Sequence, residues 1–258
     1  MKTFSLLIIL SFFIISCKKT DEKKETVLIA QKIEAESNTT KITPISHATA
    51  VIEFDNTTIY IDPTGGSAAF VSFKTPDYLV ITDIHGDHMN LKTLNELDLK
   101  NATIIAPVAV AKEISAVNSK EVIIINNGET KEIQDFSIEA IPMYNLREEA
   151  LKFHPKGRGN GYVFTINEER IYFSGDTEDI PEMRNLENID RAYVCMNLPY
   201  TMTVESAADG VLAFKPKKVY PYHYRGTNGL SDVLKFKELI ANQDTTIEVV
   251  QLDWYPKK

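Results

Sequence analysis

The chain has 258 residues, of which 43% are apolar and 25% are charged, and its formal net charge is −8. These values are ordinary for a globular protein with a sizeable core, and the length suffices for one large domain or two small ones. Because the balance is acidic and no basic patch stands out, a nucleic-acid partner is not expected.

Residues 1–16 have the pattern of a lipoprotein signal peptide. A short positive start, Met1-Lys2, precedes an almost purely apolar stretch at 4–15 that is too short to span a bilayer with normal flanks. Cys17 follows the small residue Ser16, which resembles a bacterial lipoprotein box. We therefore expect Cys17 to carry lipid and to anchor the protein to a bacterial membrane in the cell envelope, facing the periplasm or the surface. The alternative is an uncleaved anchor with an incidental cysteine.

The rest of the chain divides into a tether and one domain. Residues 17–40 are polar and charge-mixed, which is typical of a flexible tether behind the lipidated cysteine. Residues 41–258 contain no further linker and no repeat, so we predict a single domain there. Cys195 is the only other cysteine, and its apolar surroundings favour a core position over a metal ligand. With lipid on Cys17, no internal disulfide is possible.

Short β-branched runs alternate with helical patterns along this domain. Strands are predicted in the first half at 47–54, 57–63, 77–82, 102–107 and 121–125, and helices near 91–97 and 110–117. In the second half, strands are predicted at 161–166, 170–176, 191–196, 218–224 and 246–254, and helices at 204–214 and 231–243. Hairpin turns are predicted at Asp55-Asn56 and at 167–169, and Ser231 is the expected N-cap of the last helix. This mixture indicates an α/β fold with sheets covered by helices.

The segment "ITDIHGDHMN" places two aspartates and two histidines directly after a predicted strand. On an extended backbone, residues two apart point the same way, so Asp83, His85 and Asp87 project together, with His88 turned aside. Imidazole and carboxylate groups are good ligands for zinc and similar ions, and Gly86 lets the backbone turn tightly. The segment therefore predicts half of a metal site, the alternative being a solvated polar loop.

Several ordered motifs resemble those of the metallo-β-lactamase fold. The segment at 83–88 is similar to the family signature His-x-His-x-Asp-His, with Asp83 in place of the first histidine. "IYFSGDT" puts Asp176 where the family has a metal-bridging aspartate, and "VYPYHYR" puts His223 where it has its last histidine. The opening hairpin, "PISHATAVIEF" followed by "IYIDP", resembles the branch with L-ascorbate-6-phosphate lactonases and N-acyl-phosphatidylethanolamine phospholipase D.

The resemblance implies a four-layer αββα sandwich with metal ions at one edge. The implied ligands are Asp83, His85, Asp87, His88, Asp176 and His223. The first two, with a ligand from a middle motif, would form one position, Asp87, His88 and His223 would form the other, and Asp176 would bridge them. One or two divalent ions are expected, zinc first, with manganese or iron as alternatives.

The sequence departs from the family pattern in two places. Asp83 adds a negative charge and a hard oxygen ligand, which favours magnesium, manganese or iron more than a histidine does. The family's middle histidine is replaced by Tyr144 and Asn145 in "AIPMYNL". We expect the loop "KFHPKGRGNGY" to fold back so that His154 completes the first position. The rival interpretations are a surface histidine, or Asn145 or Tyr144 facing the substrate.

Four other residues near the motifs allow two interpretations each. Lys156 and Arg158 are expected to be ordinary exposed loop residues rather than contacts to an anionic substrate. His47 is either a contact behind the ligands or to the substrate, or a buried histidine satisfied by hydrogen bonds. Asp62 either holds a ligating histidine from behind or forms an Asp-Pro turn.

The predicted function is that of a metal-dependent hydrolase. A metal-bound hydroxide would attack an ester, lactone or phosphodiester bond in a small-molecule or lipid-like substrate, and Asp87 would both ligate and orient that water. Two alternatives are an iron-dependent redox protein on the same fold and a non-catalytic, metal-stabilised binding module. The sequence does not define the oligomeric state.

Overall fold

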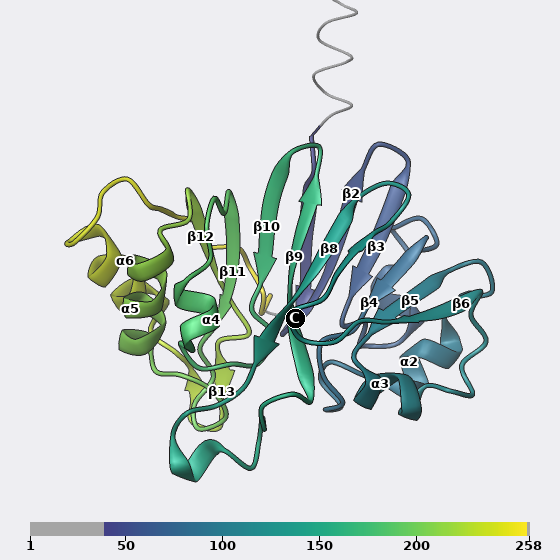
Figure 1. Ribbon diagram of the computed structural model, residues 1–258, viewed down its shortest axis with the longest axis horizontal. Helices are drawn as coiled ribbons and strands as arrows, with labels where there is room; N and C mark the ends of the chain where they lie inside the picture. Colours follow the sequence, from purple (N-terminus) through teal and green to yellow (C-terminus); the bar gives the residue numbers. More distant parts are fainter. Residues whose placement is uncertain (1–38, 257–258) are drawn as a thin grey trace, which may run out of the picture. The chain divides into compact units, whose positions relative to one another are not determined.

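Two β-sheets lie face to face in the computed structural model of this protein, which describes residues 39–256 (Figure 1). The first sheet has six strands in sequential order. The first three pair antiparallel with one another, and each of the next three pairs parallel with the strand before it. They are β1 (Lys41–Ser46), β2 (Thr49–Phe54), β3 (Thr57–Ile61), β4 (Tyr78–Val80), β5 (Thr103–Ala106) and β6 (Glu121–Ile124).

The second sheet has seven strands in the order β15-β12-β11-β10-β9-β8-β7. They are β7 (Thr130–Glu132), β8 (Ser137–Met143), β9 (Gly159–Ile166), β10 (Glu169–Phe173), β11 (Arg191–Cys195), β12 (Lys218–Tyr222) and β15 (Glu248–Val249). A short ribbon of β13 (Arg225–Gly226) and β14 (Gly229–Leu230) follows β12.

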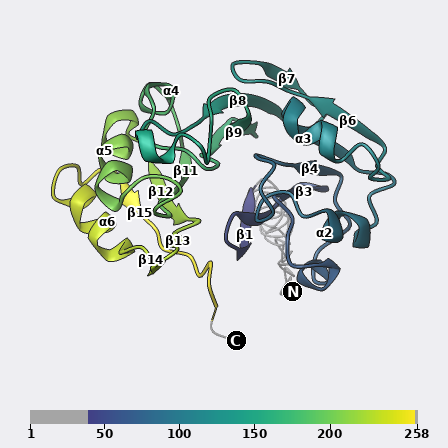
Figure 2. The same ribbon diagram turned by 90° about the horizontal axis from the view of Figure 1, so that it is seen from below.

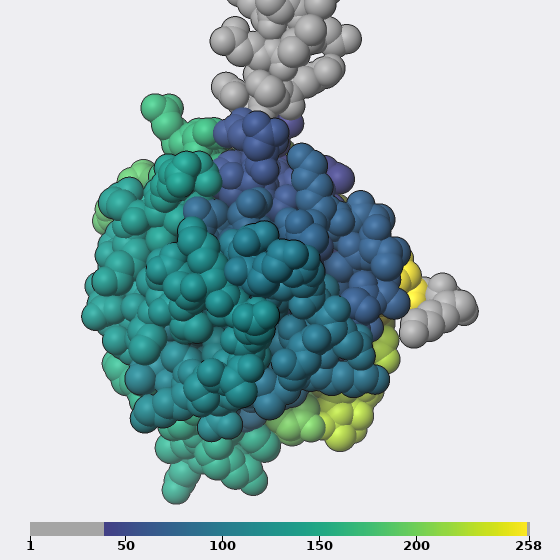
Figure 3. Space-filling model, turned by 90° about the vertical axis from the view of Figure 1, so that its right-hand side faces the viewer, coloured from purple at the N-terminus to yellow at the C-terminus, as the bar shows by residue number. Residues whose placement is uncertain are grey.

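Helices cover the outer face of each sheet, as Figure 2 shows from a second direction. The first sheet carries α2 (Leu91–Glu96) and α3 (Val108–Glu113), and the second carries α4 (Pro181–Arg184), α5 (Val204–Phe214) and α6 (Val233–Ala241). Short 3₁₀ turns, η1 (Ser67–Phe70) and η2 (Glu148–Ala150), lie in loops. The face in Figure 3 is mostly blue to teal, the colours of the first half of the chain. The predicted αββα sandwich is confirmed.

Alternating side chains divide the core between the layers. Ile59 and Ile61 of β3 pack in the cluster between the sheets, whereas Tyr60 packs with residues of α2 and α3. The core cluster between the sheets and under α5 contains many aromatic rings. Phe173 and Tyr193 of this cluster stack with their centroids 4.3 Å apart. Because both faces of the central strands are covered, their sequences are nearly continuous apolar runs.

The structure differs from the predicted elements at a few positions. The cap of α6 is Asp232, whose carboxylate accepts from the Lys235 N–H at 2.9 Å, so the expectation of Ser231 was wrong. Strand β1 precedes the predicted first strand, and β7 and β8 were not predicted. The strand expected at 246–254 pairs only at β15.

The residues from Thr40 onward form one compact unit. The predicted signal peptide at 1–16 and nearly all of the predicted tether at 17–40 lie outside the described residues. Among helices within 39–256, none is long and apolar enough to cross a membrane.

Candidate metal centre

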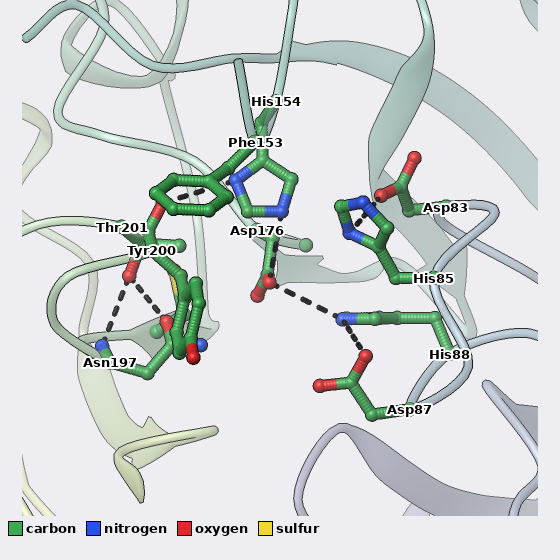
Figure 4. Close-up of polar contacts among 12 residues, drawn as sticks. Asp83, His85, Asp87, His88, Phe153, His154, Asp176, Asn197, Tyr200 and Thr201 are labelled. Atoms are coloured by element: carbon green, nitrogen blue, oxygen red, sulfur yellow. Dashed lines mark hydrogen bonds and ion pairs between the residues drawn. The ribbon is translucent and has the colours of Figure 1, made fainter. Parts of the chain in front are cut away.

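The predicted ligands meet at one edge of the sandwich, beyond the ends of several strands (Figure 4). The 83–88 loop follows β4, Asp176 follows β10 and His223 follows β12, while the loop between β8 and β9 carries His154. The carboxyl ends of strands in α/β sheets are a usual place for functional groups. The seven side chains brought together are those of Asp83, His85, Asp87, His88, His154, Asp176 and His223.

One group of ligand atoms has the spacing of a metal coordination shell. His88 Nε2 and His223 Nε2 lie 3.2 Å apart. Asp87 Oδ2 and Asp176 Oδ1 lie 3.3 and 3.4 Å from His223 Nε2, and Asp176 Oδ2 lies 3.4 Å from His88 Nε2. Ligands about 2.0–2.1 Å from a tetrahedral metal ion are separated by about 3.3 Å, so these four residues fit such an ion.

Asp62 fixes the orientation of His88 from behind. Asp62 Oδ2 lies 2.8 Å from His88 Nδ1, and the carboxylate also accepts from the N–H and the hydroxyl of Thr82 at 2.8 and 2.7 Å. Both Asp62 and His88 have no exposed surface. Since Nδ1–H donates to the carboxylate, the lone pair of His88 Nε2 points at the centre. Asp62 thus lies where the first of its two interpretations, support for a ligating histidine, places it.

The buried carboxylates of this group depend on positive charge beside them. Burial alone favours uncharged carboxyl groups, yet His223 and His88 hold the pKa of Asp176 well below its usual range. The pKa of Asp87 is lowered in the same way by a hydrogen bond from His223 and by His88. Burial opposes charging of His88, but Asp176 and Asp62 raise its pKa well above the ordinary value. Imidazole and carboxylate donors in this arrangement fit zinc, manganese or iron.

The loop between β8 and β9 folds back and brings His154 to the bridging aspartate. His154 Nε2 lies 3.2 Å from Asp176 Oδ2, and Nδ1 lies 3.1 Å from the carbonyl oxygen of Tyr200, to which it donates. Nε2 is buried and has no hydrogen-bond partner within residues 39–256. Ligand atoms of Asp83, His85 and His154 lie within 4.8 Å of one another. This geometry fits a second, adjacent metal position.

Asn145 and Tyr144 do not line the cavity, so the interpretation that they face the substrate was wrong. The Asn145 side-chain amide donates to the carbonyl oxygens of Ala150 and Tyr200 at 2.9 and 2.6 Å and lies 3.2 Å from His154 Nδ1. The Tyr144 hydroxyl donates to Glu182 at 2.8 Å. Asn145 therefore holds the loop that carries His154.

Lys156 and Arg158 were both expected to be exposed loop residues, and the structure agrees for one of them only. The Lys156 ammonium pairs with Glu182 at 2.8 Å and remains exposed, as expected of a loop lysine. The Arg158 guanidinium instead binds Asp83, and only 18% of its side chain is exposed, so the expectation for Arg158 was wrong. Cys195 is buried in the core, and burial raises the pKa of its thiol to about 12.

A cavity of about 420 Å³ opens over the centre. His47 lines it, with Nδ1 3.1 Å from the Tyr255 hydroxyl, and burial and the neighbouring His223 lower the pKa of His47. Its further lining includes Phe153, Asn197, Tyr200, Arg225 and Thr227. The sequence analysis did not select these residues. Two of them could have been found by their nearness to predicted ligands in the sequence, since Phe153 precedes His154 and Arg225 lies two positions after His223.

The comparisons with known proteins agree with this geometry. A family model described as the β-lactamase superfamily domain matches residues 41–223. A protein of Pyrococcus horikoshii named UPF0173 metal-dependent hydrolase is 31% identical over 215 residues, which cover 79% of this chain and 93% of that protein. A crystal structure of a metal-dependent hydrolase from Parabacteroides distasonis is 36% identical, with a TM-score of 0.74 over 82% of this chain and 92% of that one. A metallo hydrolase from Ignicoccus hospitalis, 21% identical, shares the fold with a TM-score of 0.69 over 83% and 94%.

Proposed function

This chain belongs to the UPF0173 family of metal-dependent hydrolases in the β-lactamase superfamily, and we propose that it cleaves an ester, lactone or phosphodiester bond. The observation that carries the proposal is the convergence of His88, His223, Asp87 and Asp176 beneath an open cavity. A divalent ion held by these residues would lower the pKa of a water from 15.7 to about 7 and would polarise the bond to be cleaved.

Asp87 is placed to orient the attacking water. Both Asp87 and Asp176 line the cavity, but the Asp87 side chain is 45% exposed, whereas that of Asp176 is only 4% exposed. Because its pKa is held below the ordinary value, Asp87 is ionised at neutral pH and accepts a proton in hydrogen bonds. Asp87 would therefore help to hold the ion and accept a hydrogen bond from the attacking water, which orients it.

The presence of Arg225 in the cavity lining favours a substrate with a negatively charged group. Its guanidinium lines the cavity and lies over the Tyr255 ring at 4.5 Å, and no carboxylate pairs with it in the part of the chain that the structure describes. The rings of Phe153 and Tyr200, with centroids 5.1 Å apart, form an apolar part of the same cavity. A small-molecule or lipid-like substrate with a negative group and an apolar part would match both features.

A panel of matched chromogenic substrates tests this proposal. The metal-loaded protein is assayed with a 4-nitrophenyl ester, a lactone and bis(4-nitrophenyl) phosphate, before and after chelation and after metal is returned. We expect turnover of at least one class, lost with the metal and restored by it, and absent in the control His223→Ala. Metal bound at full occupancy with no turnover of any class would contradict the proposal and favour a non-catalytic binding module.

We also propose that lipid on Cys17 holds the protein at a bacterial membrane, with the domain in the envelope. The support is the sequence pattern at 1–17 alone, since these residues lie outside the described part. Intact mass measurement of protein from the membrane fraction of a bacterial host is the test. We expect a diacylglyceryl-type mass increase that is absent in Cys17→Ser, and an unmodified mass with residues 1–16 retained would contradict the proposal.

A further inference from the structure

Arg158 binds the carboxylate that stands in the first metal position. Its Nε donates to Asp83 Oδ1 at 2.9 Å and its Nη2 donates to Asp83 Oδ2 at 2.7 Å. Asp83 has no exposed surface, so this bidentate pair is partly shielded from water. Both oxygens that Asp83 offers to a metal ion therefore already accept hydrogen bonds from a cation.

The same guanidinium also contacts the second ligand of that position. Arg158 Nη2 lies 3.3 Å from His85 Nε2, while His85 Nδ1 lies 2.9 Å from Asp83 Oδ2. At the other position, the recorded ion pairs of Asp87 and Asp176 within residues 39–256 involve histidines only. Among residues 39–256, the carboxylate of the first position is thus bound directly by a permanent positive charge, whereas those of the other position pair with histidines.

The backbone fixes Arg158 at this place. The N–H of Asn160 donates to the carbonyl oxygen of Thr82 at 3.0 Å, which ties the start of β9 to the residue before Asp83. Gly159 allows this approach, because a Cβ there would lie 2.9 Å from the same carbonyl oxygen. Arg158 Nη2 also donates to the carbonyl oxygen of Phe153 at 2.5 Å. The guanidinium is held by the fold and does not depend on a chance side-chain rotamer.

We propose that Arg158 makes the two metal positions unequal, so that the position of Asp87, His88, Asp176 and His223 fills first and the other binds far more weakly. The charges of Asp83 and Arg158 cancel, and the pair contributes no net attraction for a second divalent ion. An ion at His85 and His154 would also lie close to the guanidinium, and like charges repel strongly where water is scarce. The proposed hydrolysis then runs on one tightly held ion per chain.

Metal titration of Arg158→Met is the direct test. We expect the wild-type chain to hold one tight ion per chain after gel filtration, with a second dissociation constant at least 100-fold weaker by calorimetry. In Arg158→Met the Asp83 carboxylate keeps only its contact with His85 and is no longer bound by a cation, so the second dissociation constant should tighten at least tenfold. Lys156→Met is the matched control, since it removes a cation of the same loop that pairs with Glu182, and it should leave both constants unchanged.

Two outcomes would overturn the proposal. The first is two ions of equal affinity in the wild-type chain, and the second is an unchanged or weaker second site in folded Arg158→Met. If Arg158→Met does not fold without metal, Arg158→Lys replaces it, because a lysine keeps the charge and should keep the first position weak. Anomalous scattering from wild-type crystals grown with limiting zinc gives an independent reading, with occupancy expected at His88 and His223 and near zero at His85 and His154.

Discussion

Replacing Asp62 with asparagine tests how the protein presents His88 to a metal ion. In the wild-type chain the Asp62 carboxylate accepts from His88 Nδ1–H at 2.8 Å, which leaves Nε2 free as a ligand. The amide of Asp62→Asn has one oxygen, which the Thr82 N–H occupies at the position of Oδ1. Its NH₂ group then faces His88 Nδ1 and donates to it. This forces the imidazole proton onto Nε2, so the side chain is held in a tautomer that cannot ligate.

The size of the effect follows from these contacts. Removing a hydrogen-bond partner behind a metal-ligating histidine lowers metal affinity about 10- to 100-fold, which corresponds to about 1.4–2.7 kcal/mol. A hydrogen bond to a charged group contributes about 1.5–3 kcal/mol to stability, which is a similar range. Because Asp62 and His88 are fully buried, water cannot substitute for the lost acceptor. We therefore expect the upper half of the range, about 30- to 100-fold weaker binding.

Competition with a chromogenic chelator measures the affinity of the tight site in both proteins. Asp77→Asn is the matched control, because Asp77 makes a similar carboxylate contact, to the Thr58 N–H at 2.9 Å, away from the centre. Its metal affinity should equal that of the wild-type chain. Thermal unfolding of both variants in chelator checks that the fold is retained. An Asp62→Asn protein that folds and binds metal as tightly as wild type would refute the proposed role of the Asp62–His88 pair.

Four other substitutions have defined outcomes. His88→Ala and His223→Ala should each abolish metal-dependent hydrolysis while circular dichroism shows most of the fold intact; retained activity would remove them from the centre. His154→Ala should leave the tight ion in place by elemental analysis and should retain hydrolysis, because the proposed reaction runs on that ion; loss of the tight ion would contradict this. Burial raises the pKa of Asp190, but hydrogen bonds from a lysine and a backbone N–H lower it overall, so the charged form stabilises the fold above about pH 4 and this contribution is lost as pH falls. Asp190→Asn should then cost about 0.5–1 kcal/mol by denaturant unfolding at pH 7 and progressively less as the pH is lowered below about 4, and a loss that does not change with pH would contradict the assignment.

The parts of the centre that follow strands could be predicted from the sequence. Apolar β-branched runs mark where β4, β10 and β12 end, and the ligands come within a few residues of those ends. Local pattern therefore sufficed for Asp83, whereas Asp176 and His223 were assigned from the resemblance of their segments to the family motifs. Strand β8 was not predicted, and it contains Pro142, a residue that is unfavourable in a strand interior. In the structure β7 pairs only with Ser137–Glu139, so Pro142 lies beyond that pairing and its missing N–H costs nothing there.

The contacts that tie loops to the centre could not be predicted, because their partners are far apart in the sequence. Arg158 and Asp83 are separated by 75 residues, and a loop arginine considered alone is expected in water. His154 depends on the Tyr200 carbonyl 46 residues away, and only the resemblance to a family with a middle ligand suggested that its loop folds back. The predicted and observed N-caps of α6 differ by one residue for a local reason. Ser231 and Asp232 both have capping side chains, and the helix begins where the carboxylate reaches Lys235.

The backbone at the strand ends suggests why this edge of the sandwich holds a site at all. His47, Asp62 and His223 directly follow β1, β3 and β12, and all three have left-handed φ angles, of 51°, 44° and 45°. Such a conformation costs a residue other than glycine about 1–3 kcal/mol, which packing elsewhere has to offset. A glycine would adopt it freely but would leave no side chain at the turn. The strained conformation therefore occurs at three positions where the chain turns and a ring or carboxylate points inward. It lowers the stability of the fold, and we attribute its presence to the function of these side chains.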